Sequence, residues 1–185
     1  MITRPTGTVI VLNGTSSAGK SSIARELLPI LDEQFYLMAR DDFNSMRHQR
    51  PLSDEALETV LDRMVRGFHR AVAGMAATGN NLVVDHIMRE SSWVTDFVSV
   101  VTGDVVLVGV HCPLPELRRR EYERGDRPIG LVDAQFDKAH RDLVYDLEVD
   151  TSVSSPVDCA LRIRSFLTAR PRTRALDRLR GNMSH

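Results

Sequence analysis

The sequence predicts one three-layer α/β domain, in which helices cover both faces of a five-stranded parallel sheet. Five short apolar runs alternate along the chain with longer segments of helical periodicity, which is the pattern of β-α-β units. A glycine-rich segment joins the first apolar run to the first helical segment. The length of 185 residues suits a single domain, and no repeat or linker divides residues 1–185.

The expected strands are short, largely continuous apolar runs. Strands that are buried on both faces of a parallel sheet have this character. Because crossovers between parallel strands are right-handed, the carboxyl ends of all the strands meet at one edge of the sheet, where ligands bind. The five runs lie at 8–13, 35–39, 81–85, 105–111 and 145–149.

The expected helices connect these strands. The longest, 54–78, has one broad stripe of apolar residues at spacings of three and four. Ser53 is a suitable N-cap for it, and Gly79 ends it. The arginine-rich tail, 171–185, is expected to be loosely held. The other expected helices lie at 21–31, 91–101, 115–124, 133–143 and 155–169.

Composition and charge argue against several classes of protein. Hydrophobic residues make up 42% of the chain and charged residues 26%, and the net charge of −1 gives no basis for binding nucleic acid or an anionic membrane. No apolar run approaches the roughly 18 residues of a membrane span, and the first run is too short for a signal peptide, so we expect a cytoplasmic protein. Cys112 and Cys159 are too few for a disulfide scaffold, and we expect buried free thiols, with one structural disulfide as the alternative.

The segment 14–21 (GTSSAGKS) matches the phosphate-loop motif G-x-x-x-x-G-K-[ST] at every fixed position, between a strand and a helix. Backbone N–H groups of such a loop face the phosphates of a nucleotide. We expect Lys20 to reach the β- and γ-phosphates and the Ser21 hydroxyl to ligate Mg²⁺. The motif predicts a P-loop NTPase fold of the nucleotide-kinase type. The expected nucleotide-binding residues in this segment are Gly14, Ser16, Ser17, Ala18, Gly19, Lys20, Ser21 and Ser22.

Carboxylates follow two of the expected strands. Asp85 ends the third strand and is expected to hold Mg²⁺ through water or to orient the substrate hydroxyl; capping of the next turn is the alternative. Asp41 and Asp42 follow the second strand. A kinase needs a group that orients and deprotonates the attacking hydroxyl, and we assign this role to Asp41, with Asp42 as the second choice. An N-cap role remains open for both, since aspartate favours that position.

An arginine-rich segment follows the fourth strand. Arg120 and Arg124 are four residues apart and share one face of the expected helix, and Arg127 follows Gly125, a natural helix stop. In small kinases a basic lid closes over the nucleotide and neutralises charge on the transferring phosphoryl group. We therefore expect a lid at about 115–140 that carries these three arginines. The alternative is a solvated helix stabilised by Glu–Arg pairs.

Ordered motifs along most of the chain resemble one family of kinases. The segment 13–21 (NGTSSAGKS) is followed by Asp41, Asp85, 108–112 (VGVHC), 120–121 (RE), 124–127 (RGDR) and 145–151 (YDLEVDT). This series resembles chloramphenicol phosphotransferase. The resemblance implies transfer of the γ-phosphoryl group of ATP to a primary hydroxyl of an antibiotic, with Asp41 as base and Arg120, Arg124 and Arg127 in the lid. It also implies that Thr151 lies beside the nucleotide.

The chain departs from that family where the acceptor would bind. Arg47, His48 and Arg50 occupy a stretch that is more apolar in the family enzyme, and His86 stands where a second aspartate is expected. These changes favour a more polar or anionic acceptor, such as a sugar- or nucleoside-bearing antibiotic. The residues expected to contact the acceptor are Asp41, Asp42, Arg47, His48, Asp85 and His86.

The sequence thus predicts a phosphotransferase that uses ATP or GTP with Mg²⁺ to phosphorylate a small-molecule alcohol, with antibiotic inactivation as its role. A metabolic or toxin-type kinase of a sugar, nucleotide sugar or nucleoside would use the same groups. A nucleotide-binding module without turnover and a polynucleotide kinase are weaker alternatives, the latter resting only on the arginine-rich tail. A homo-oligomer is compatible with the sequence, which does not determine the oligomeric state.

Overall fold

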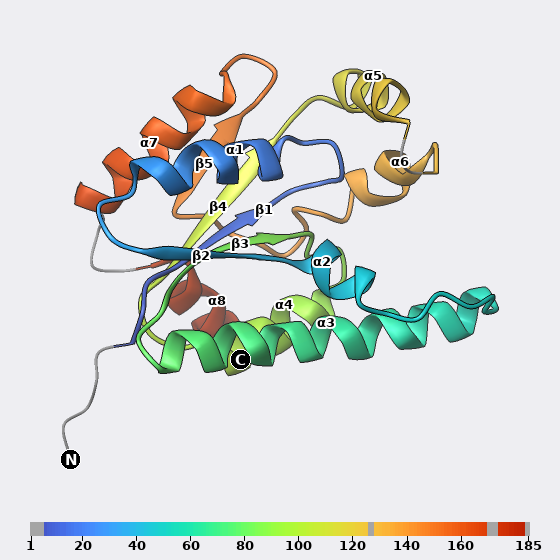
Figure 1. Ribbon diagram of the computed structural model, residues 1–185, viewed down its shortest axis with the longest axis horizontal. Coiled ribbons are helices and arrows are strands. Elements are labelled where there is room, and N and C mark those ends of the chain that lie inside the picture. The colour runs from blue at the N-terminus through green and yellow to red at the C-terminus, as the bar shows by residue number, and fades with distance from the viewer. Residues whose placement is uncertain (1–5, 126–127, 170–173, 184–185) are drawn as a thin grey trace.

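A computed structural model describes residues 6–125, 128–169 and 174–183. At its centre is a five-stranded sheet in the order β2-β3-β1-β4-β5, with every strand pair parallel, as the sequence predicts (Figure 1). The strands are β1 (Val9–Asn13), β2 (Phe35–Ala39), β3 (Asn81–His86), β4 (Val105–His111) and β5 (Leu147–Asp150).

Helices cover both faces of the sheet (Figure 1). One face carries α1 (Lys20–Leu27) and α7 (Pro156–Ala169), and the other carries α3 (Asp54–Ala77), α4 (Ser91–Val100) and α8 (Ala175–Met183). At the carboxyl edge of the sheet lie α2 (Arg40–Ser45), α5 (Leu114–Arg124) and α6 (Leu131–Phe136). A short 3₁₀ helix, Leu28–Ile30, follows α1. No helix in the described part of the chain is long and apolar enough to cross a membrane.

The core has two halves because successive side chains of a strand point to opposite faces. In β1, Val9 and Val11 pack with α3, α4 and α8, whereas Ile10 and Leu12 pack with α1 and α7. Burial on both faces explains why β1 is a continuous apolar run. Cys112 and Cys159 are buried free thiols, as the sequence predicts.

Strand register places the candidate site residues. Ala39 of β2 pairs with Asp85 of β3. Asp41, two residues after Ala39, therefore lies just past the level of Asp85 at the carboxyl edge of the sheet. On the other side of β3, Asn13 of β1 pairs with His86. The carboxyl ends of β1, β2 and β3 therefore lie next to one another, as expected for a parallel sheet.

The structure differs from the sequence prediction in several elements. The strand expected at 145–149 is β5, Leu147–Asp150, and the helix expected at 133–143 is the short α6. A helix that the periodicity did not predict, α2, begins directly after β2 and has Asp41 and Asp42 in its first turn. A helix of six residues is too short to show an apolar stripe, so the pattern carries no signal for it.

The largest difference concerns the tail, which was expected to be loosely held. Residues Ala175–Met183 form α8, and Ala175, Leu176 and Leu179 are buried against α4 and β4. Arg174 also forms an ion pair with Asp104 (Nη2 to Oδ1, 3.0 Å). Apolar residues hidden among the arginines therefore anchor this segment.

Candidate active site

The phosphate loop joins β1 to α1 and needs glycine at both ends. A Cβ at Gly14 would lie 2.3 Å from the carbonyl oxygen of Val110 in β4, so only glycine lets the loop pass this strand. Gly19 has a φ of +90°, in the left-handed region, and directly precedes α1. These two positions allow the loop to curve tightly and to present backbone N–H groups to an anion.

Three predicted groups meet at the start of α1. Ser21 Oγ donates a hydrogen bond to Asp85 Oδ2 at 2.6 Å. Lys20 Nζ lies 3.8 Å from Asp85 Oδ1 and donates to the carbonyl oxygen of Thr15 at 2.8 Å. The Lys20 side chain is only 6% exposed, so its ammonium group is held in place by the loop.

This arrangement fits a Mg²⁺ ion that arrives with a nucleotide. Mg²⁺ prefers oxygen ligands and commonly combines one or two protein groups with phosphate oxygens and water. The hydroxyl of Ser21 and the carboxylate of Asp85 supply such oxygens side by side. Within the described residues, no group of three or more His, Cys, Asp or Glu side chains could hold a metal alone. The remaining ligands would therefore be phosphate oxygens and water.

A cavity of about 660 Å³ lies at the carboxyl edge of the sheet, within the size range of small-molecule sites. Its wall is formed by the phosphate loop, the start of α1, the ends of β2 and β3, the first turn of α2 and the end of α5. Of the residues predicted to bind nucleotide, it includes Ser16, Ser17, Gly19, Lys20, Ser21, Ser22 and Thr151, whereas Gly14 and Ala18 shape the loop behind it.

The aspartates after β2 face this same cavity. Asp41 and Asp42 lie in the first turn of α2 and line its wall. Arg40 Nη2 donates to Asp41 Oδ1 at 2.7 Å, while the Asp41 side chain stays 44% exposed. Since Arg40 itself is largely buried, it fixes the carboxylate without covering it. The structure therefore places Asp41 where a bound alcohol could reach it.

The arginine helix α5 approaches the cavity from the nucleotide side. Arg120 donates to Thr151 through Nη1 to Oγ1 (2.9 Å) and through Nη2 to the carbonyl oxygen (2.8 Å). Thr151 Oγ1 in turn donates to the carbonyl oxygen of Ala18 at 3.0 Å, which connects α5 to the phosphate loop. Arg124 lines the cavity and is exposed. The third predicted lid arginine, Arg127, lies outside the described residues.

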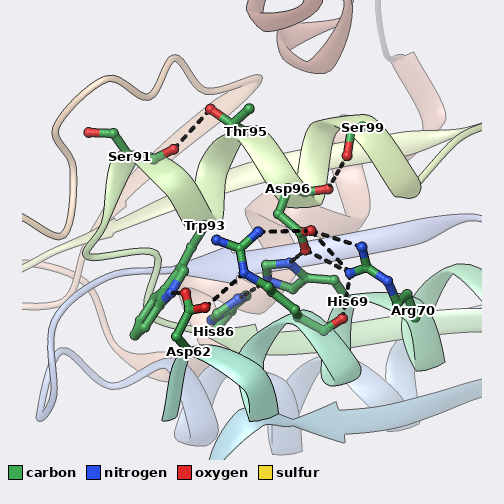
Figure 2. A network of polar contacts seen from close by, with 10 residues as sticks. Asp62, His69, Arg70, His86, Ser91, Trp93, Thr95, Asp96 and Ser99 are labelled. Carbon is green, nitrogen blue, oxygen red and sulfur yellow. Dashed lines mark hydrogen bonds and ion pairs between the residues drawn. The ribbon is translucent and has the colours of Figure 1, made fainter. Parts of the chain in front are cut away.

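Three residues expected to contact the acceptor lie elsewhere or point away. Arg47 and His48 follow α2 and are not among the residues that line the cavity. His86 contributes to the cavity wall, but its ring is fully buried and contacts His69 on α3 (Figure 2). Burial and the positive charges nearby hold the pKa of His86 well below 6.5, so the ring is neutral. Arg47 and His48 therefore lie outside the lining of the cavity, and the ring of His86 is engaged with His69.

The family of chloramphenicol phosphotransferase-like proteins matches residues 7–168, which is most of the chain. The chain belongs to this family. The predicted class of enzyme, a phosphotransferase with an alcohol acceptor, is thus confirmed at the level of the family.

Proteins of similar sequence agree with that assignment. Two proteins from strains of Mycobacterium tuberculosis that carry O-phosphotransferase in their names are each 30% identical to it over 200 residues, covering 95% of this chain and 89% of theirs.

Solved structures of kinases share the fold. The APS kinase of Mycobacterium tuberculosis, solved with AMPPNP and APS, has a TM-score of 0.67 at 19% identity and covers 89% of this chain and 99% of its own. A gluconokinase from Sinorhizobium meliloti has a TM-score of 0.59 at 18% identity, with coverage of 90% and 99%. These likenesses confirm the predicted P-loop kinase fold.

Sequence reasoning missed two residues that connect α6 to α5 and to the phosphate loop. Glu121 is 4% exposed and accepts hydrogen bonds from the N–H groups of Gly130 (2.8 Å) and Val132 (3.0 Å) at the start of α6. Gln135 on α6 accepts from the N–H of Ser16 at 2.9 Å. Within a run of charges, nothing marks Glu121 as buried, because its burial depends on the packing of α6 against α5.

Asn13 at the end of β1 was also missed. Its Nδ2 donates to the carbonyl oxygen of Ala139 (2.6 Å) and to the hydroxyl oxygen of Tyr145 (2.7 Å), and its Oδ1 accepts from the N–H of Met88 at 2.8 Å. Tyr145 in turn contacts His140 Nδ1 at 2.7 Å. Asn13, the residue directly before the phosphate loop, therefore connects the end of β1 to two neighbouring segments, the one at Ala139–Tyr145 and the one at Met88.

Proposed function

We propose that the protein transfers the γ-phosphoryl group of ATP, or of GTP, to a hydroxyl group of a small molecule with the help of Mg²⁺. The observation that supports this best is the shared cavity. Lys20, Ser21 and Asp85 lie on one side of it and Asp41 lies on the other. A nucleotide and an alcohol could therefore meet between a phosphate-binding loop and a general base.

Each group has a defined role in this reaction. The loop N–H groups and Lys20 bind the phosphates, and Ser21 and Asp85 hold Mg²⁺, which would neutralise charge on the phosphate oxygens. Asp41 accepts the proton of the hydroxyl as its oxygen bonds to the γ-phosphorus. The bond from that phosphorus to the β-γ bridging oxygen breaks, and the nucleoside diphosphate leaves with the electron pair. Arg120 and Arg124 supply positive charge on the nucleotide side of the cavity.

The acceptor in this proposal is an antibiotic, either similar to chloramphenicol or more polar, and its phosphorylation confers resistance. Family membership supports this class. The polar character of the cavity near α2, where Arg40, Asp41 and Asp42 line the wall, supports a polar molecule such as a sugar- or nucleoside-bearing antibiotic. A metabolic sugar or nucleotide sugar would suit the same polar wall. We place the reaction in the cytoplasm, where ATP is supplied.

Mass spectrometry of reactions with Mg²⁺ and ATP or GTP tests this function. The panel contains chloramphenicol, nucleoside- and sugar-bearing antibiotics, simple sugars and nucleotide sugars. We expect one class of alcohol to gain the mass of one phosphoryl group. Absence of any phosphorylated product, with nucleotide binding confirmed, would argue for a binding module instead.

The substitution Asp41→Asn tests the assignment of the base. It keeps the size of the side chain but removes its ability to accept a proton, so we expect kcat to fall on the order of a hundredfold or more. Affinity for ATP should stay near that of the wild type, because Asp41 lies on the acceptor side. Asp42→Asn is the matched control, and we expect it to change kcat only a few fold. A larger effect at Asp42 would move the base to that residue.

A further inference from the structure

A buried chain of polar groups runs from α4 through α3 to the end of β3 (Figure 2). Asp96 on α4, His69 on α3 and His86 at the end of β3 are 6%, 0% and 0% exposed. Asp96 Oδ2 contacts His69 Nδ1 at 2.7 Å, and His69 Nε2 contacts His86 Nε2 at 2.8 Å. His86 Nδ1 accepts the N–H of Ile87 at 2.7 Å. The reaction described above uses none of these contacts.

The contacts allow one direction of hydrogen bonding when both rings are neutral. The N–H of Ile87 can only donate, so Nδ1 of His86 carries no proton. The proton of His86 is then on Nε2 and is donated to Nε2 of His69. His69 consequently carries its proton on Nδ1 and donates it to the carboxylate of Asp96. Each link has one donor and one acceptor, so the tautomer of each ring fixes that of the other.

Charged and aromatic side chains around Asp96 and His69 hold this series of hydrogen bonds in place at its end on α4. Asp96 Oδ1 accepts from Arg66 Nη1 at 3.3 Å, and Arg70 Nη1 contacts Asp96 Oδ2 at 3.0 Å, which offsets the burial of the carboxylate. Phe97 packs edge-on against the ring of His69, with centroids 5.3 Å apart. Asp96 is therefore a fixed acceptor at one end of the chain.

The inner end lies beside a catalytic group. His86 follows Asp85, which bonds Ser21 Oγ, and Ile87 follows His86. If His86 changed tautomer, its Nδ1–H would face the N–H of Ile87, and this buried donor would lose its partner. The end of β3 would then shift, and displacements of about 1 Å at a reacting site can lower rates by about a hundredfold.

We propose that Asp96 and His69 are positioning residues that act through His86. They hold the ring of His86 in the tautomer that accepts the N–H of Ile87, and so keep the carboxylate of Asp85 beside Ser21. The effect on turnover rests on the proposed kinase function. The tautomers themselves, and the binding of Mg²⁺ with a nucleotide, do not depend on turnover.

Nitrogen NMR of the whole protein labelled with ¹⁵N-histidine tests the direction of these hydrogen bonds at neutral pH. We expect His86 to carry its proton on Nε2 and His69 to carry its proton on Nδ1. A proton on Nδ1 of His86 would overturn the proposal. This measurement needs no substrate and no variant.

Two variants at His69 test the positioning role. In His69→Gln the side-chain carbonyl oxygen can still accept the Nε2–H of His86, whereas His69→Leu removes this acceptor. We expect His69→Leu to lower kcat on the order of 10- to 100-fold and to raise the Mg²⁺ concentration needed for half-maximal activity, with KM for the alcohol unchanged. His69→Gln should recover most of this loss. A role in packing alone predicts the reverse order, because leucine is the better residue for an apolar core.

A control separates this effect from general loss of stability. Val98→Ala removes buried atoms from α4, which packs against α3, but leaves the hydrogen bonds of Asp96, His69 and His86 intact. At temperatures below the melting temperature of the variant, its kcat should match that of the wild type. Equal activity in His69→Leu and His69→Gln would overturn the proposal. If the wild type phosphorylates no alcohol, the proposed function fails. The affinity of the same variants for Mg²⁺ and a non-hydrolysable ATP analogue still decides the positioning role, with weaker binding expected in His69→Leu alone.

Discussion

A single hydroxyl group, that of Thr151, connects the arginine helix to the phosphate loop. It donates to the carbonyl oxygen of Ala18 and accepts from Arg120 Nη1. Thr151→Val keeps the shape of the side chain and removes both bonds, each of which contributes roughly 0.5–1.5 kcal/mol. Together the two bonds are worth about 1–3 kcal/mol, so we expect the Kd of an ATP analogue, measured by calorimetry, to rise by between about 5-fold and about 150-fold.

Thr151→Ser is the matched control for this prediction, because it keeps the hydroxyl group. Its Kd should stay within about threefold of the wild type. If the serine variant loses as much affinity as the valine variant, the methyl group of Thr151, which packs near Gly19, contributes as much as the hydroxyl group.

The roles of residues that belong to a sequence motif could be predicted from the sequence, whereas the roles of residues that depend on tertiary packing could not. Lys20, Ser21 and Asp85 were predicted because chemistry fixes their spacing from a strand end, and they meet in the structure. Glu121 and Gln135 were not, since a buried carboxylate and a surface one look alike in a charged run. His86 was predicted to face a substrate, because the sequence does not show that α3 provides a histidine partner for it.

At the scale of elements, α8 shows how few apolar residues are needed to anchor a charged tail. Leu176 is 2% exposed and packs on the α4 side of the sheet. Removing a buried leucine side chain costs about 2–5 kcal/mol, so Leu176→Ala should lower the free energy of unfolding by about 2–3 kcal/mol in urea titrations.

Leu161→Ala on α7 is the matched control, because this leucine is 48% exposed and the chemical change is the same. Its effect should be under about 1 kcal/mol. A loss of under about 1 kcal/mol in Leu176→Ala as well would mean that α8 adds little stability to the domain.

The strands were easier to predict than the short helices that surround the site. Burial on both faces makes the central residues of β1, β3 and β4 apolar, and such a continuous apolar run is visible in the sequence. By contrast, α2 and α6 have six residues each, too few to show an apolar stripe. These helices carry Asp41 and Gln135, so the least predictable elements hold part of the site.

At the scale of the whole molecule, the ends of two neighbouring strands are held by buried polar groups rather than by apolar packing. Asn13 bonds Tyr145 and the N–H of Met88 at the end of β1, and His86 bonds His69 and the N–H of Ile87 at the end of β3. Buried polar networks specify geometry when all members are satisfied. This arrangement leaves the carboxyl edge open to ligands while fixing its geometry.

Buried neutral histidines also make the fold sensitive to acid, and His140 gives the clearest case. Its Nδ1 contacts the hydroxyl group of Tyr145 at 2.7 Å, its ring stacks on His111 with centroids 4.1 Å apart, and burial lowers its pKa to about 4. Between pH 6.5 and about 4 the unfolded chain therefore binds a proton at His140 that the folded chain does not. The free energy of unfolding must fall as the pH drops through this window, and this contribution levels off below pH 4.

The substitution His140→Asn isolates this contribution. The asparagine side-chain oxygen can replace Nδ1 as the acceptor for the Tyr145 hydroxyl, but it does not titrate. Between pH 7 and pH 4.5, urea titrations should show the wild type losing about 2 kcal/mol more stability than the variant. His69 and His86 also have lowered pKa values and contribute to the slope in both proteins, so the difference between the two curves reports His140 alone. Parallel curves over this range would show that His140 is protonated equally readily in the folded and unfolded chains.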